Sequence, residues 1–425
     1  MKILLGLSSF YPGNSAGTEN YVLNLAKELQ KNNFEVSIVI PSVGKKIETY
    51  IYEEINVYNF YVPLKLSTLE LNGLDKISGI DEFSKILDNI KPDIFHLHSL
   101  SRSFHAEHIK IAKQKKIKTV FTGHLGGTFC VNADIQLFQK ESCDAYVNKN
   151  RCLACFIKNK KKYSIILSKI FAIFINLIIK TSLKYKFPAF NIVIFKLQQL
   201  EILKKFSDAN IAIAPWLNKA FKINNFENVF LVNQGINSKF IEEKIEKLDK
   251  DKIELIFIGR MHPDKGVDLL IEALVEFKSV FNLTVITIPF NDENDFYNKI
   301  KIQFFELGFT NWLEKLPQNE VSKRLSFADI LILPSTKNEA APLVILEAFA
   351  KKIPVIGSDY IAIPDMVKHN FNGLIFKNGD VNSLKQQLKR IIKEPNLLKS
   401  LSKNIEIPRT FKDITLDMIE IYNKI

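Results

Sequence analysis

The amino-acid sequence predicts an α/β protein made of two doubly wound, Rossmann-like domains. Short apolar runs, typical of buried parallel strands, alternate with helical patterns along the chain. This alternation restarts after residue 252, and 425 residues suffice for two hydrophobic cores. We expect domains at residues 1–217 and 218–405, followed by a C-terminal helix at 406–425 that can pack back on the first domain.

The first domain opens with a strand at 2–7, a glycine-containing loop "YPGNSAGTE" and a helix. That helix is predicted from apolar residues recurring every three or four positions, namely Tyr21, Val22, Leu25, Ala26 and Leu29. Further strands are predicted at "EVSIVIP", "PDIFHLHS", "IKTVFTGH" and "DANIAIAP", with a helix near 104–114.

The second domain is predicted from strands at 253–258, 283–288, 330–333, 353–356 and 374–376, with helical patterns between them. The first of these strands ends at Gly259-Arg260, and Lys265-Gly266 precedes the next helix. Neither half contains the G-x-G-x-x-G fingerprint, which argues against binding of NAD or FAD.

The positive charge is concentrated in one segment, residues 158–205. The net charge of the chain is +12, but this segment alone holds eleven lysines and a single acid, Glu201, a net of +10. The rest is nearly balanced, so we expect no nucleic-acid partner. Within the segment, residues 165–179 are almost wholly apolar yet shorter than the roughly 20 residues that span a bilayer. We predict peripheral contact with an anionic membrane. A buried helix pair with a solvated lysine rim is the alternative.

All four cysteines lie in a loop at 130–155: Cys130, Cys143, Cys152 and Cys155. A four-thiolate zinc site and two disulfides are both compatible with this clustering, and so are ordinary buried cysteines. Since only Cys152 and Cys155 have close spacing, we assign no metal to this loop and leave these possibilities open. The short apolar start of the chain breaks at Pro12-Gly13 and is interpreted as a buried strand in a cytoplasmic protein, not as a signal peptide.

The stretch "EAAPLVILE" contains two glutamates around a helix start. Pro342 is expected at the first helical position, where its missing N–H is tolerated. Glu339 would then lie in the loop at the helix mouth and Glu347 about 7 Å along the axis. Carboxylates accept hydrogen bonds from hydroxyls, so the pair suits a polyhydroxylated ligand that carries phosphate. Alternatively, Glu339 shapes the loop and Glu347 is a solvated helix residue.

Arg260 and Lys265 follow the first strand of the second domain, at the sheet edge where Glu339 is also expected. Two cations and a helix N-terminus at one edge can hold a diphosphate without a metal. Taken singly, the two cations can also be ordinary surface charges.

The motifs "FIGRMHPDKGVDLLIEAL", "LPSTKNEAAPLVILEAFAKKIPVIGSD" and "MVKHNFNGLIF" resemble the C-terminal signature of the retaining glycosyltransferases of family 4, which have the GT-B fold. "SSFYPGNSAGTENYVLNLAKELQKNNFEVSIV", "DIFHLHS" and "VFTGH" are similar to the N-terminal half of that family. Two positions depart from the family pattern: Ala16 replaces a usual glycine, and Asp365 a usual glutamate.

The resemblance implies retaining transfer of a sugar from a nucleotide-diphosphate sugar to a glycan or lipid-linked acceptor, in cell-surface polysaccharide synthesis at the inner face of the membrane. No cofactor besides the donor is implied. Arg260 and Lys265 would neutralise the departing diphosphate. Glu339 would contact the transferred sugar and Glu347 the ribose.

The remaining implied contacts involve the backbone and the facing domain. The backbone at Ala340, Ala341 and Leu343 would cradle sugar and phosphate, and Gly17 would let the first loop approach the phosphate. His124 would lie near the transferred sugar, unless it is only a satisfied histidine at a strand end. A nucleotide-sugar epimerase of the same fold, or a non-catalytic nucleotide-sugar-binding partner in a glycan-assembly complex, is the alternative.

Overall fold

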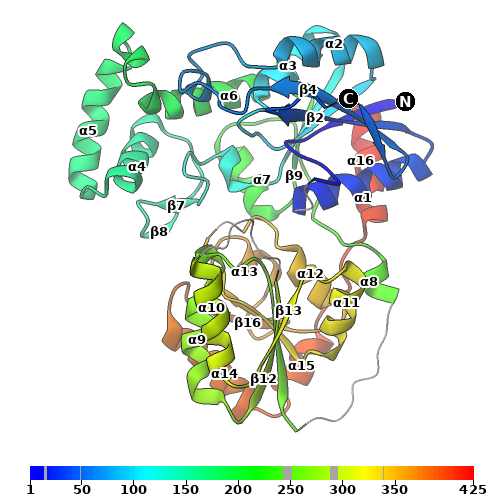
Figure 1. Cartoon of the computed structure of the whole chain (residues 1–425), viewed down its shortest axis with the longest axis vertical. Coiled ribbons are helices and arrows are strands. Elements are labelled where there is room, and N and C mark those ends of the chain that lie inside the picture. Colours follow the sequence, from blue (N-terminus) through cyan, green and yellow to red (C-terminus); the bar gives the residue numbers. More distant parts are fainter. Residues whose placement is uncertain (14–16, 48, 243–250, 288–294, 338) are drawn as a thin grey trace. The chain divides into compact units, whose positions relative to one another are not determined.

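The computed structural model describes the whole chain except residues 14–16, 48, 243–250, 288–294 and 338. The chain divides into two compact units, one comprising Met1–Asn233 with Lys412–Ile425 and the other Gln234–Phe411 (Figure 1). Each unit has a twisted sheet with helices on its faces, so the predicted pair of Rossmann-like α/β domains is confirmed.

In the first unit, the described residues form an eight-stranded sheet in the order β10-β9-β6-β5-β1-β2-β4-β3. All neighbours are parallel except β3 and β4. The strands are β1 (Lys2–Gly6), β2 (Glu35–Val43), β3 (Tyr50–Tyr52), β4 (Ile55–Val62), β5 (Ile94–His98), β6 (Lys118–Gly123), β9 (Ala209–Ala212) and β10 (Val229–Leu231).

The helices of the first unit cover this sheet or extend away from it. They are α1 (Gly17–Lys31), α2 (Ile80–Ile90), α3 (Ala106–Gln114), α4 (Lys149–Lys161), α5 (Ile165–Ile178), α6 (Ile192–Phe206), α7 (Pro215–Ile223) and α16 (Phe411–Lys424). The predicted apolar stripe of α1 is confirmed, because all five of its residues are fully buried. A short hairpin, β7 (Gln136–Leu137) and β8 (Glu141–Ser142), lies in the cysteine loop.

The second unit has an all-parallel sheet in the order β13-β12-β11-β14-β15-β16. Its strands are β11 (Ile253–Ile258), β12 (Phe281–Thr287), β13 (Thr310–Glu314), β14 (Ile330–Leu333), β15 (Val355–Ser358) and β16 (Gly373–Phe376). Its helices are α8 (Lys239–Glu242), α9 (Val267–Leu274), α10 (Asp295–Glu306), α11 (Gln318–Phe327), α12 (Leu343–Ala350), α13 (Ile363–Met366), α14 (Val381–Lys393) and α15 (Leu397–Lys403). The order reverses between the neighbours β11 and β14, where ligands of such sheets bind beyond the carboxyl ends of the strands.

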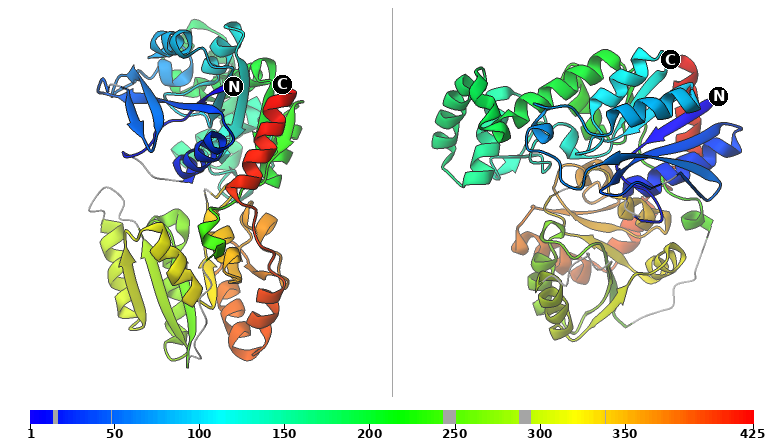
Figure 2. Two further views of the ribbon diagram at one scale, coloured as in Figure 1. Left: turned by 90° about the vertical axis from the view of Figure 1, so that its right-hand side faces the viewer. Right: turned by 45° about the horizontal axis from the view of Figure 1, so that its top comes forward.

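The boundary between the units differs from the predicted one. The first unit continues to Asn233 and does not end at residue 217, because β10 pairs in parallel with β9 and so extends the first sheet. The C-terminal helix belongs to the first unit, where the Tyr422 hydroxyl lies 2.6 Å from His96 Nδ1. Figures 1 and 2 show α16 in this unit, with both termini.

Other predicted element boundaries need small corrections. The strand expected at 353–356 is shifted to Val355–Ser358, because Pro354 cannot donate a ladder hydrogen bond inside a strand. The strand expected at 283–288 covers Phe281–Thr287, and residue 288 lies outside the described residues. The strands that were not predicted are β3, β4, β7, β8, β10 and β13.

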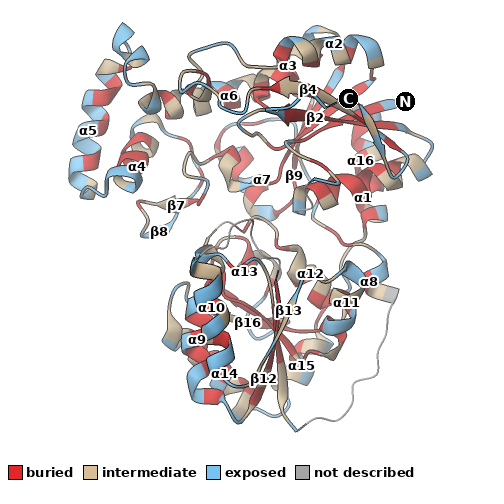
Figure 3. Cartoon of the chain, viewed as in Figure 1, coloured by how far each residue is buried: buried red, intermediate tan, exposed pale blue. Residues whose placement is uncertain are grey.

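The basic segment is mostly helical, and α4 and α5 pack together on a small core of their own. Leu153, Phe156, Ala172, Ile175 and Val193 belong to this core. The packed face of α5 uses only part of its surface, so the helix is largely pale blue in Figure 3. Its outward apolar side chains are exposed: Ile166, Leu167, Ile170, Phe171, Ile173, Phe174 and Leu177. None of the described helices has the length and apolarity that a bilayer crossing requires.

Several histidines of the first unit are buried in a neutral form. His96, His98 and His124 line the carboxyl ends of β5 and β6, and His108 packs against the Phe60, Phe83 and Phe104 rings. Burial lowers the pKa of His96, His108 and His124 from 6.5 to about 3, and that of His98 well below 6.5. These imidazoles are therefore uncharged at neutral pH.

Acid should destabilise the first unit before its carboxylates titrate. In the unfolded chain, a histidine such as His108 is protonated below about pH 6.5. In the folded unit its pKa is about 3, so it stays neutral at pH 5. Between these two pH values, each buried histidine lowers the free energy of unfolding by up to about 1.4 kcal/mol per unit fall in pH. Urea unfolding at pH 6.5 and 5 should show this loss, and His108→Gln should flatten it by about one histidine's share. An unchanged slope would contradict the assignment.

Candidate functional site

The loops after β11 and β14 are joined at the carboxyl edge of the second sheet. After β11 come Gly259, Arg260 and a 3-10 turn, Pro263–Lys265, that leads into α9. The Asp264 carbonyl accepts a hydrogen bond from the backbone N–H of Thr336, at 2.8 Å, in the loop after β14. The two loops therefore hold each other in register.

Gly266 allows these loops to approach closely. Its φ is +63°, and a Cβ at this position would lie 2.1 Å from the Pro334 carbonyl oxygen. An L-residue would therefore meet both left-handed backbone strain and a backbone clash. This explains why a glycine directly follows Lys265.

Lys265 and Glu339 form an ion pair between these loops. The Lys265 ammonium lies 2.5 Å from Glu339 Oε1, and the two side chains are only 17% and 8% exposed. Ser335 Oγ donates a second hydrogen bond to the same oxygen, at 2.7 Å. The Ser335 carbonyl in turn accepts from Ser358 Oγ at 2.6 Å, which ties the loop to the end of β15. The carboxylate is thus held in one orientation.

The other predicted residues of this edge lie around the ion pair. Arg260 is exposed, while Ala340, Ala341 and Leu343 are partly buried between Glu339 and the first turn of α12. Pro342 is the N-cap of α12, with an extended conformation, and not its first helical residue. The correction follows from its ψ of 111°, which lies outside the helical range.

Glu347 lies on α12, about 6 Å along the axis from Leu343. It is partly buried, and burial raises its pKa from 4.5 to about 7. In the part of the chain that the structure describes, no group pairs with its carboxylate. A fully solvated Glu347 is therefore wrong, and the carboxyl is available to hydroxyl donors.

Gly17 and His124 belong to the first unit. Gly17 begins α1, and among the described residues, its chain neighbours and own helix apart, no atom lies within 4 Å of a Cβ built there. Ala16, the departure from the family pattern, lies outside the described residues. His124 is buried, with Nε2 3.0 Å from His98 Nδ1 and its ring edge-on to Tyr21. One of its nitrogens is therefore already engaged, as the alternative interpretation of a satisfied histidine expects.

Three supporting residues were not singled out from the sequence. Ser335 and Ser358 hold the Glu339 loop, and His98 holds His124. Ser335 lies two residues after β14 and Ser358 is the last residue of β15. A serine at the carboxyl end of a buried strand was a usable signal, because these ends of parallel sheets face the ligand edge. Asp365, the other departure from the family pattern, lies on α13.

The four cysteines line one narrow cavity, of about 20 Å³, in the first unit. All four are free thiols, and burial raises the pKa of each, to about 12 for Cys130 and about 11 for Cys143. The described residues contain no group of three or more His, Cys, Asp or Glu side chains that could hold a metal. The four cysteines are not paired in disulfides, which was one of the possibilities compatible with the sequence.

Two family models match the chain. Residues 238–407 match glycosyl transferases group 1, and residues 15–141 match glycosyltransferase family 4.

Curated relatives are distant. The chain is 25% identical to the amylovoran biosynthesis glycosyltransferase AmsK of Erwinia amylovora, over 39% of this chain and 42% of that protein. It is 22% identical to the alpha-monoglucosyldiacylglycerol synthase of Acholeplasma laidlawii, over 96% of this chain and 95% of that protein. The chain spans about half the length of AmsK and of a further relative, the glycosyltransferase MJ1178 of Methanocaldococcus jannaschii, at 42% and 53% of those proteins.

Solved structures share the fold over the whole chain. A sucrose-phosphate synthase from Thermosynechococcus elongatus has a TM-score of 0.68 and 16% identity, covering 100% of this chain and 98% of that one. Anabaena HepE in complex with UDP-glucose has a TM-score of 0.64 and 13% identity, with 100% of both chains covered. At such identities the likeness shows the fold alone.

Replacing Gly266 should disrupt the junction of the two loops. Gly379→Ala is a matched control, since Gly379 also has a positive φ (+73°) but no atom within 4 Å of a Cβ. We expect Gly379→Ala to cost about 1–2 kcal/mol from backbone strain. Gly266→Ala adds the clash with Pro334, so its unfolding free energy should fall further. Equal losses in chemical denaturation would contradict the close approach.

Proposed function

The chain belongs to the glycosyl transferases of group 1, and from this premise we propose that it transfers a sugar, with retention, from a nucleotide-diphosphate sugar to a glycan or lipid-linked acceptor. The observation that carries the proposal is the buried Lys265–Glu339 ion pair at the carboxyl edge of the second sheet. It brings a fixed cation and a fixed hydroxyl acceptor to the edge where ligands of this fold bind.

Lys265 and Arg260 are assigned to the donor diphosphate. Cleavage of the glycosyl–phosphate bond builds negative charge on the leaving oxygen, and cations held near it stabilise the transition state more than the ground state. The ion pair with Glu339 fixes the Lys265 ammonium before the donor arrives, so little reorganisation is needed. Retention follows if the acceptor attacks the face from which the leaving group departs, with that group's oxygen taking the acceptor proton.

Glu339 is assigned to the hydroxyls of the transferred sugar, and Glu347 to those of the ribose. Both carboxylates accept hydrogen bonds, and Glu347 has no partner among the described residues. The backbone at Ala340, Ala341 and Leu343 is assigned to sugar and phosphate. From the first unit, Gly17 and the neutral His124 are assigned to the phosphate and the sugar.

The relatives support the classes of donor and acceptor. HepE is solved with UDP-glucose, and the names of two relatives refer to amylovoran and to a glucosylated diacylglycerol. We propose a nucleotide sugar as donor and a role in polysaccharide or glycolipid synthesis.

We also propose a cytoplasmic location at the inner face of the membrane, with the α4–α5 hairpin as the contact. The exposed apolar side of α5 and the +10 charge of residues 158–205 support this. Each lysine near an anionic surface contributes about 1 kcal/mol. A 14-residue helix of about 21 Å can lie in the interface, which needs no crossing.

Lys265→Met should lower turnover by about 10²–10³-fold, as loss of a charge-stabilising donor does. Release of nucleotide diphosphate from a labelled UDP-sugar, with lipid and glycan acceptors, measures this. Lys323→Met is the control, because Lys323 is exposed and lies on α11, outside the loops after β11 and β14. Parental rates for Lys265→Met would refute the assignment, and an epimerised nucleotide sugar formed without acceptor would favour an epimerase.

Donor affinity should depend on the ionisation of Glu347. With a pKa of about 7, its carboxyl gains charge between pH 6 and 8, and the ionised form accepts hydrogen bonds from hydroxyls more strongly. Affinity for the nucleotide should therefore rise across this range, and Glu347→Gln should remove the rise and weaken binding about tenfold at pH 8. Calorimetric titrations with UDP, GDP and ADP test it. A pH profile that survives in Glu347→Gln would exclude ribose contact.

Membrane contact should depend on both the lysines and α5. Co-sedimentation with anionic vesicles is expected to fall at high salt, because lysine–lipid attraction is screened over a Debye length of about 8–10 Å. Phe174→Ser with Ile173→Ser should weaken it further by removing apolar contacts. Absence of binding to any vesicle would overturn the proposed contact while leaving donor binding unaffected.

A further inference from the structure

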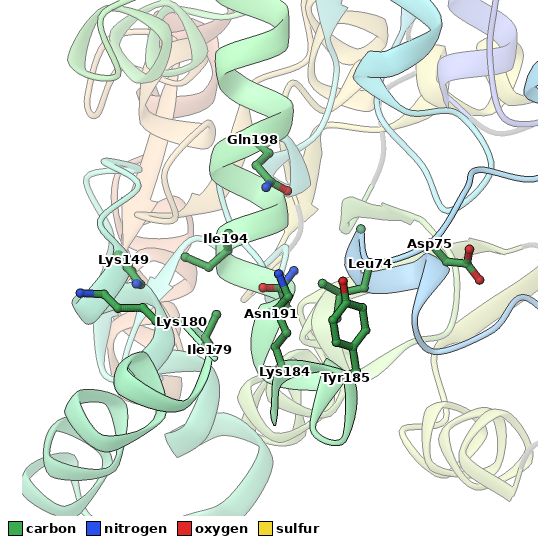
Figure 4. Close-up of a pocket in the computed structure, with 11 residues that line it drawn as sticks. Leu74, Asp75, Lys149, Ile179, Lys180, Lys184, Tyr185, Asn191, Ile194 and Gln198 are labelled. Carbon is green, nitrogen blue, oxygen red and sulfur yellow. The ribbon is translucent and has the colours of Figure 1, made fainter. Parts of the chain in front are cut away.

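A basic pocket lies at the base of the α4–α5 hairpin (Figure 4). It is formed by the start of α4, the end of α5, the 3-10 turn Ser182–Tyr185, the start of α6 and the loop at residues 73–75. Its volume is about 430 Å³, enough for a phosphate-bearing headgroup. Three lysines line it: Lys149, Lys180 and Lys184.

These lysines lack acidic partners. In the described part of the chain, no carboxylate forms an ion pair with any of the three. Lys149 and Lys180 lie side by side in Figure 4, and their mutual repulsion adds to burial in lowering the pKa of Lys149. Asp75, the one acid of the lining, lies at the opposite end of the pocket and accepts from the neighbouring Lys76 N–H. An uncompensated cluster of cations favours an anionic ligand.

An apolar groove continues from the basic pocket. The two share Gly73, Asp75, Ile194 and Gln198, and the groove has a volume of about 790 Å³. It runs between α6 and the α2 and α3 helices and is lined mainly by apolar residues: Ile77, Ile80, Ile111, Phe195, Leu197 and Ile202. Its further charged residues, Lys76, Glu107 and Glu201, form ion pairs with Asp81, Lys110 and Lys204. A cationic pocket that opens into an apolar groove matches the two parts of an anionic amphiphile.

The positive charge of this surface favours an anionic lipid over a second copy of the chain as its ligand. A second copy of the chain would bring another segment of net charge +10 against the first, and the two would repel. An anionic lipid is complementary in both parts, and the exposed apolar side of α5 lies on the same hairpin.

We propose that the basic pocket binds the phosphate headgroup of an anionic lipid, with Lys149, Lys180 and Lys184 as its ligands and the lipid chains against the apolar groove. The inference rests on the proposed membrane contact and makes that contact specific for a phosphate headgroup. A merely electrostatic contact would use all lysines of the segment alike.

The test compares two triple variants that remove the same charge. The pocket variant removes the three lysines of the pocket by the substitutions Lys149→Gln, Lys180→Gln and Lys184→Gln. The control variant removes three lysines from the last turn of α4 by the substitutions Lys158→Gln, Lys160→Gln and Lys161→Gln. Binding of the full chain is measured on phosphatidylcholine vesicles with and without phosphatidylglycerol. We expect the pocket variant to bind anionic vesicles at least about tenfold more weakly than the control variant, since it loses charged hydrogen bonds.

Equal losses in the two variants would overturn the headgroup pocket but keep the membrane contact. Absence of vesicle binding by the parent would overturn both. Inorganic phosphate alone distinguishes a lipid site from a site for free phosphate. If phosphate protects the parent from thermal unfolding as strongly as anionic vesicles do, the lipid assignment is overturned. If the triple pocket variant is less stable than the parent, vesicle binding is compared for two single variants of exposed lysines. These are Lys180→Gln in the pocket and Lys160→Gln on α4. Nucleotide binding by the second unit is measured separately, so failure of the transferase proposal remains distinguishable.

Discussion

The ion pair between Lys265 and Glu339 is the contact on which the candidate site of the second unit depends. It joins loops from β11 and β14, the strands between which the order of the sheet reverses. A buried ion pair must offset the cost of removing both charges from water, and this requires additional hydrogen bonds. Ser335 supplies one, and Gly266 lets the loops come close enough for the pair to form. Backbone shape and charge therefore act together.

The two units share a doubly wound parallel core but carry different polar residues at its carboxyl end. At the carboxyl end of the second sheet, a cation and a carboxylate compensate each other. At the corresponding end of the first, His96, His98 and His124 remain neutral, because burial without a carboxylate partner disfavours the imidazolium. A neutral imidazole can still donate or accept a hydrogen bond. The first unit thus offers polar contacts without net charge, whereas the second offers charge.

The surface features of this chain fall outside the matched family regions. The models cover residues 15–141 and 238–407, so α4, α5 and the basic pocket lie largely between them. The ion-pair site, in contrast, lies within the second matched region. The family match therefore includes the ion-pair site, while the α4–α5 hairpin lies in a part of the chain that neither family model covers.

The sequence by itself determined the fold class, because alternating apolar runs and helical stripes report local periodicity directly. It also determined the position of Lys265 and Glu339 at one sheet edge, since residues after parallel strands share that edge. Only the tertiary structure decided that these two side chains pair with each other, that Glu347 is partly buried, and that α5 exposes its apolar side. The contacts of Lys265 join residues 74 positions apart, and the exposure of α5 depends on how little of it α4 can cover. Such facts depend on packing, which periodicity does not encode.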